Sequence, residues 1–189
     1  MIGNHQKQAL LFLLLATALL GGCATMDEAE CVSADWYALG HDDGQQGKKA
    51  AHYSEYRKDC SAYGVNVDAD AYADGWESGI RDYCTRDNGY RVGVVGKIYQ
   101  SSCPLVLADT FVSSYQSGRA VYLKQLRVNS LRHKVQKTGD DLSKTDLTDE
   151  QRQSLSAKRK QAKRDLELAN IALSLSKSEA RNQGFAASY

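Results

Sequence analysis

The chain has little proline, and its apolar runs are short. Its single proline is Pro104, and its main apolar stretch, residues 9–20, is shorter than the about 20 residues of a membrane-spanning helix. Several chemical motifs are also missing: Gly-x-Ser-x-Gly, His-x-x-x-His, Cys-x-x-Cys and a nucleotide-binding loop. These absences disfavour a membrane span in that run, a serine-hydrolase elbow, a zinc knuckle and a nucleotide site.

The N-terminus does contain a leader of the secretory type. Lys7 is the one charge of the first eight residues, the apolar run follows, and it ends at Leu20-Gly21-Gly22-Cys23. A weakly basic start, a short apolar core and then small residues are typical of an export signal. These last four residues resemble the lipobox of bacterial lipoproteins, although Ala or Ser is commoner at the position of Gly21.

The lipobox resemblance implies that residues 1–22 are removed and that Cys23 is lipidated, with residues 23–30 as an acidic tether. Anchoring becomes stable with two or three acyl chains, at ~0.8 kcal/mol per buried CH₂. Ala24 follows the cysteine, and in Gram-negative lipoproteins a residue other than Asp there implies the outer membrane, facing the periplasm. The alternative is an ordinary signal peptide with Cys23 as a chance thiol.

Charge and composition divide the rest of the chain near Cys103-Pro104. Residues 23–104 hold 8 basic and 14 acidic residues, whereas residues 105–189 hold 15 basic and 9 acidic ones. The first part carries the cysteines and most glycines, and the second is rich in Leu, Lys, Arg, Gln and Ser. We therefore expect a cysteine- and glycine-rich helical domain over 31–104 and a helical arm over 105–189, in an all-α protein.

The four remaining cysteines predict two disulfides, because an even number in an exported chain favours pairing. We expect one helix over 34–57 and a second over 69–83, with a short helical or irregular segment over 88–100. A continuous first helix would hold Cys31 and Cys60 ~35 Å apart, beyond the reach of a disulfide. We therefore predict the pairs Cys31–Cys84 and Cys60–Cys103.

Glycines recur at helical spacing within an internal repeat. Asp-x-Tyr-Ala-x-Gly-x-x-x-Gly begins at Asp35 and again at Asp70. Each glycine inside a helix costs roughly 1 kcal/mol against alanine, so we expect these helices to gain close approach of another backbone. The predicted close-packing glycines are Gly40, Gly44, Gly47, Gly75, Gly79, Gly93 and Gly96. Alternatively, some of them mark turns.

Residues 31–118 resemble an uncharacterised family of small bacterial lipoproteins rich in Cys, Gly and Tyr. The matching residues include Cys31, Asp35-Trp36-Tyr37, Asp43-Gly44, Cys60, Tyr83-Cys84-Thr85, Asn88-Gly89, Cys103-Pro104 and Gly118. The resemblance implies no activity, since the function of that family is unknown.

The second half has coiled-coil spacing. Val121, Val128, Val135 and Leu142 are seven residues apart, as are Leu155, Ala162 and Ala169, which predicts an antiparallel helical hairpin. Thr138-Gly139-Asp140-Asp141 indicates a stop and turn, Thr148 begins a capping box, and Gly184 ends the second helix. The seam is thin, so a partner chain, a second copy or the first domain is expected to complete its burial.

No catalytic, cofactor or metal site is predicted. An enzyme would need paired carboxylates in one cleft, and the candidates are Asp42 or Asp43 with Asp74 or Glu77. His41 and His52 are eleven residues apart and could share a helix face. The acidic segment 68–74 lacks the glycine and the final glutamate of a calcium loop, so it is interpreted as a helix start.

Two functions remain. The first is a non-enzymatic envelope lipoprotein that binds an envelope protein, anionic lipid or cell-wall polymer through its arm, with the basic cluster at 158–164, or through its aromatic domain. Nucleic acid is an implausible partner for an exported chain. The second is a protein that binds or processes cell-wall glycan, for which Trp36 and Trp76 are the candidate binding aromatics, although aromatics in a small domain more often form its core.

The intact mass of the protein from envelope membranes tests these predictions. We expect a chain that begins at Cys23, carries acyl chains and gains four hydrogen atoms on reduction, two for each disulfide. A mass without acyl chains, or without a gain on reduction, would contradict the anchor or the disulfides respectively.

Overall fold

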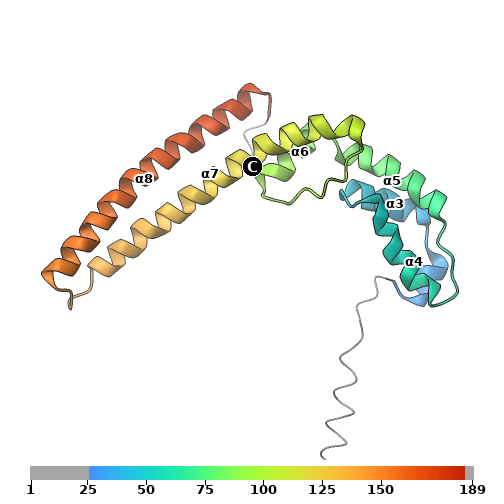
Figure 1. Cartoon of the computed structure of the whole chain (residues 1–189), viewed down its shortest axis with the longest axis horizontal. Helices are drawn as coiled ribbons and strands as arrows, with labels where there is room; N and C mark the ends of the chain where they lie inside the picture. Colours follow the sequence, from blue (N-terminus) through green and yellow to red (C-terminus); the bar gives the residue numbers. More distant parts are fainter. Residues whose placement is uncertain (1–25, 186–189) are drawn as a thin grey trace, which may run out of the picture.

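A computed structural model describes residues 26–185, and every regular element among them is helical, which confirms the predicted all-α class. The elements in order are α2 (Glu28–Ser33), α3 (Trp36–Gln45), η2 (Ala50–His52), α4 (Tyr53–Ser61), α5 (Ala69–Tyr83), α6 (Arg86–Val94), α7 (Leu105–Leu142) and α8 (Asp149–Asn182). Figure 1 shows a cluster of short helices from which the long α7–α8 hairpin extends. In the described part, no helix has the length and apolarity needed to cross a membrane.

The helices α3 and α5 touch through their backbones. A Cβ at Gly40 would overlap the carbonyl oxygen of Tyr72, and one at Gly79 would overlap that of His41. Gly44 and Gly75 face backbone atoms of the opposite helix in the same way. These four glycines therefore allow the predicted close approach of two helix backbones, because any side chain at these positions would push the two helices apart.

The helices α6 and α7 repeat this crossing. A Cβ at Gly93 would overlap the carbonyl oxygen of Tyr115, and one at Gly118 would overlap that of Tyr90. The first half of α7 is therefore packed into the glycine-rich part of the molecule, and the packed unit extends beyond residue 104. The two helix pairs therefore have the same arrangement, each with a short glycine-containing helix against a longer one.

Gly47 and Gly96 lie at turns, as the alternative interpretation allowed. Both have a positive φ, 74° and 78°, which glycine adopts without the strain of a side chain. At Gly47 the amide donates to the carbonyl of Gly44, and the next amide donates to that of Asp43, a Schellman ending. An aromatic ring also packs on each glycine, Tyr83 on Gly47 and Tyr122 on Gly96.

This turn breaks the helix that was predicted over 34–57, and that prediction is wrong. The helix α3 ends at Gln45, and the chain re-enters helix through η2 and α4. The reversal brings Cys60 back to Cys31, with 5.5 Å between their Cα atoms. Gly47 therefore ends a helix and does not contact another helix from within one.

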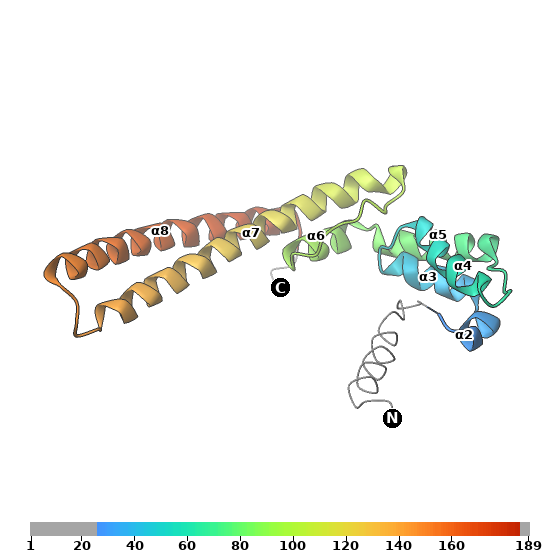
Figure 2. The same cartoon turned by 60° about the horizontal axis from the view of Figure 1, so that its bottom comes forward.

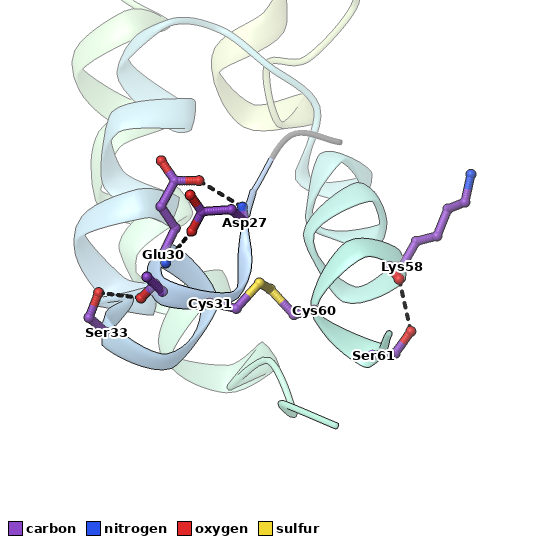
Figure 3. Close-up of a disulfide and its surroundings, with 8 residues drawn as sticks. Asp27, Glu30, Cys31, Ser33, Lys58, Cys60 and Ser61 are labelled. Atoms are coloured by element: carbon purple, nitrogen blue, oxygen red, sulfur yellow. Dashed lines mark hydrogen bonds between the residues drawn. A yellow bond between two sulfur atoms is a disulfide. The ribbon is translucent and has the colours of Figure 1, made fainter. Parts of the chain in front are cut away.

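The predicted disulfide pairs are consequently wrong. The disulfides are Cys31–Cys60 and Cys84–Cys103. Figure 3 shows the first one joining α2 to α4, beside the capping box in which Asp27 and Glu30 bind each other's backbone amides. The second joins Cys84, the residue after α5, to Cys103, just before α7, and so closes the loop that contains α6.

The arm has the predicted antiparallel pairing. Val121, Val128 and Leu131 of α7 are buried with Ala169 and Leu173 of α8, and the two helices lie side by side in Figures 1 and 2. The predicted turn at 138–141 is wrong, because α7 continues through Leu142. The capping box at Thr148 is confirmed.

The end of α8 is attached to the second helix pair. After the positive-φ residue Gly184, the ring of Phe185 stacks on Tyr90 with 4.3 Å between ring centroids. The guanidinium of Arg86 lies over the ring of Phe185, 4.1 Å from its centroid. It also donates a hydrogen bond to the carbonyl of Gln183. The base of the arm is therefore fixed by α6 as well as by α7.

We predict opposite effects for two Gly→Ala substitutions within helices. Gly79→Ala should lower the free energy of unfolding by about 3 kcal/mol or more, because a methyl group would collide with the backbone of α3. Gly139→Ala, where the nearest atoms belong to the flexible Arg159 side chain, should be neutral or stabilising by up to about 1 kcal/mol. Urea unfolding followed by circular dichroism measures both, and equal effects would contradict the crossing.

Candidate functional site

The described residues contain one buried charged cluster, centred on Asp43. Asp43 is 2% exposed and lies on α3 between the contact glycines. Its Oδ1 is 2.6 Å from the Nζ of Lys48, and its Oδ2 accepts hydrogen bonds from the hydroxyls of Tyr56, at 3.0 Å, and Tyr72, at 2.8 Å. The Nε2 of His52 lies 3.8 Å from the same oxygen.

These contacts join α3, the following turn, η2, α4 and α5 through one carboxylate. A buried carboxylate costs several kcal/mol unless it is paired and hydrogen-bonded, and here both of its oxygens have partners. Burial first, and then the neighbouring Asp43, raise the pKa of Tyr56 and of Tyr72 well above the usual value of 10.0. Neutral tyrosines that donate hydrogen bonds to a fixed carboxylate stabilise the fold.

The two candidate binding tryptophans pack against the core. Trp36 contacts the buried cluster around Cys31 and Cys60, and its ring lies 6.5 Å from that of Tyr56. Trp76 lies between two core clusters, and its indole N–H donates to the carbonyl of Lys48 at 2.9 Å. Both tryptophans are partly buried, so this packing favours the core interpretation over a glycan platform.

The candidate carboxylates lie in different environments. Asp43 is buried and binds Lys48, Tyr56 and Tyr72. Asp42 is exposed, and Glu77 forms an ion pair with Arg81 on the surface of α5. His52 lies between Asp43 and Glu55, whereas His41 stacks on Tyr37. Among residues 26–185 no group of three or more His, Cys, Asp or Glu side chains is placed to hold a metal ion.

The segment 68–74 begins a helix, as interpreted from its acidic residues. The Asp68 side chain accepts the amide of Ala71, and α5 starts at Ala69. Cys23, the predicted lipidation site, and the leader that precedes it lie outside the described residues.

The arm exposes large apolar side chains that its own seam leaves uncovered. On α8, Leu168 is 66% exposed, Ile171 57% and Leu175 60%, and the three lie on successive turns. On α7, Leu123 and Leu126 are also exposed, at 51% and 45%. The sequence pattern identified the buried seam but missed these residues, although their spacing of three and four gives a second apolar line beside the first.

A shallow groove of about 210 Å³ lies between the two arm helices beside Leu168. Its apolar lining comes from Leu168, Ala169 and Ala172, and Lys124 and Arg127 line the α7 side. Asp165 is the one acidic residue of that lining. The groove therefore combines an apolar floor with a mainly basic rim.

Part of the chain is similar to a protein family whose activity is unknown. Residues 35–120 match the model of a family described as "Protein of unknown function (DUF2799)". No curated protein and no solved structure shows significant similarity to the chain. The matched segment covers both glycine crossings and ends within α7, before most of the arm. The predicted resemblance to an uncharacterised family is confirmed in this respect, and it assigns no activity.

Alkaline titration tests the Asp43 cluster. In the unfolded chain the phenols ionise near pH 10, whereas in the folded protein Tyr56 and Tyr72 keep their protons to higher pH. The unfolded state therefore releases protons first, and the free energy of unfolding should fall above pH 10, by about 1.4 kcal/mol per pH unit for each delayed phenol.

The measurement is ultraviolet absorbance of tyrosinate against pH, together with urea unfolding at each pH. Tyr56→Phe should remove one delayed phenol and make the stability slope shallower. Ionisation of every tyrosine near pH 10 while the chain remains folded would contradict the cluster.

Proposed function

We propose that the protein is a lipid-anchored, non-enzymatic lipoprotein of the cell envelope whose helical arm binds another protein. The observation that carries the proposal is the exposed apolar line Leu168, Ile171 and Leu175 on α8. Three large apolar residues on successive turns, each more than half exposed, are typical of a helix face that a partner covers.

The chemistry of the groove favours an amphipathic helix with acidic flanks as the partner. Its apolar face would cover Leu168 and Ala172, and its carboxylates would pair with Lys124 and Arg127 at the rim. A second copy of this arm is a poorer occupant, since residues 105–189 carry 15 basic and 9 acidic residues and two such arms repel each other.

The anchor is part of the same proposal. Cys23 follows a leader whose last residues resemble a lipobox, and lipidation there would tie the glycine-rich helices to a membrane surface. The arm extends away from those helices in Figures 1 and 2. Anchoring at one end and binding at the other is a structural or adaptor role, and it requires no catalytic group. The outer membrane, facing the periplasm, is the proposed location in a Gram-negative cell, because Ala24 follows the cysteine.

Photo-crosslinking in intact cells tests the arm. A benzoyl-phenylalanine placed at Leu168 of the full-length chain should give one discrete adduct, and mass spectrometry of the joined peptide should identify an amphipathic acidic helix. Lys124→Glu with Arg127→Glu should reduce the adduct about tenfold, because the acidic flanks would then meet like charges.

The control is the same photo-crosslinker at Val32, an apolar residue of α2 that is 70% exposed and lies outside the arm. That position should give no adduct with the same protein. An adduct between two copies of this chain would reassign the arm to self-association, and the absence of any adduct at Leu168 would overturn the binding role.

A further inference from the structure

A second cavity lies in the glycine-rich part, at the junction of the two helix pairs. It has a volume of about 860 Å³. Residues at the end of α3 and α5 form one side, and α6 with the loop after it forms the other. The cavity shares no lining residue with the arm groove.

The charged residues that line this cleft are basic. They are Arg91 of α6 and Lys97 of the following loop, and no Asp or Glu is part of the lining. Asp82 is close enough to accept a hydrogen bond from Gln45, at 3.1 Å, but it does not line the cleft. Within residues 26–185, neither Arg91 nor Lys97 takes part in the ion pairs of the structure.

The guanidinium of Arg91 is held in place by a neutral partner. Its Nε and Nη2 donate to Oδ1 of Asn88 at 3.1 and 2.6 Å. Asn88 is 9% exposed, and its own amide donates to the carbonyl of Tyr83 at 2.7 Å. Asn88 is thus a positioning residue, which fixes the cation without neutralising it and leaves further N–H donors of the guanidinium for a ligand.

The rest of the lining suits a peptide. Three glutamines, Gln45, Gln46 and Gln100, offer amides that can both donate to and accept from peptide groups. Val95 and Ile98 are 50% and 81% exposed at the same surface and can contact an aliphatic side chain.

We propose that this cleft binds the free C-terminal carboxylate of a peptide chain. The carboxylate oxygens are bound by Arg91 and by Lys97, the guanidinium fork matching the planar carboxylate. The glutamines bind the preceding peptide groups, and the last side chain lies against Val95 and Ile98. The proposal uses none of the arm residues, so it stands or fails separately from the arm's proposed partner.

Chemical-shift perturbation of the full-length, isotope-labelled protein in detergent micelles tests the cleft. The probe is N-acetyl-Ala-Ala-Val with a free carboxylate, and the matched ligand is its C-terminal amide. We expect the acid to shift the amide resonances of Arg91, Lys97 and Gln46 in a saturable manner, and the amide ligand to bind about tenfold more weakly or worse, because it lacks the charge.

Variants assign the binding to the two cations. Arg91→Met should weaken the acid about tenfold and Arg91→Lys by less, since lysine keeps the charge but loses the fork. Arg81→Met, on the outer face of α5, is the control and should bind like the wild type. Should Arg91→Met fail to give a folded circular dichroism spectrum, Lys97→Met, in an exposed loop, carries the same test.

Inorganic phosphate is the competing ligand, because it shares the oxyanion chemistry. Displacement of the peptide by phosphate only at a large excess supports the proposal. Equal binding of the acid and the amide, unchanged affinity in both cleft variants, or phosphate binding as tight as or tighter than that of the peptide acid would each overturn it.

Discussion

Backbone-to-backbone contact between helices is the constraint on which this structure depends. In both helix pairs a carbonyl of one helix lies where the other would place a Cβ, at Gly40 and Gly79 in the first pair and at Gly93 and Gly118 in the second. The glycines cost the isolated helices roughly 1 kcal/mol each, and the close approach recovers that cost through dense packing that larger residues would prevent. The short helices are stable because they are packed, since helices of about ten residues are marginal alone.

Two further devices hold the first pair together around the crossing. Asp43 binds the hydroxyls of Tyr56 and Tyr72 and the ammonium group of Lys48, so the turn at Gly47 and the helices on both sides of it are tied to one buried point. The Cys31–Cys60 disulfide then closes the loop that this turn creates. In the second pair, Val92 is part of the buried core. The Cys84–Cys103 disulfide joins the end of α5 to the segment before α7, and Phe185 stacks on Tyr90 of α6.

The molecule has two parts, a body made of two similar helix pairs closed by disulfides and a long helical arm. The family match ends within α7, so most of the basic arm with its exposed leucines lies beyond the matched segment. The two surfaces differ in chemistry as well. The arm groove has an apolar floor with a basic rim, whereas the cleft of the body is lined by amides and by the fixed cation Arg91.

The sequence alone determined the helical class, the paired seam of the arm and the helix contacts at Gly40, Gly44, Gly75, Gly79 and Gly93. Each of these is a short-range periodic pattern that one helix face expresses. The helix over 69–83 and the cap at Thr148 were likewise predictable from local signals.

The disulfide pairs were not predictable in this way, because they depend on whether Gly47 continues a helix or ends it, and both outcomes fit the same spacing. Tertiary structure decided that point: the ring of Tyr83 packs on Gly47, and Asp43 is buried among residues of four other segments. The cleft around Arg91 was equally hidden from the sequence, since it arises only where two similar helix pairs meet.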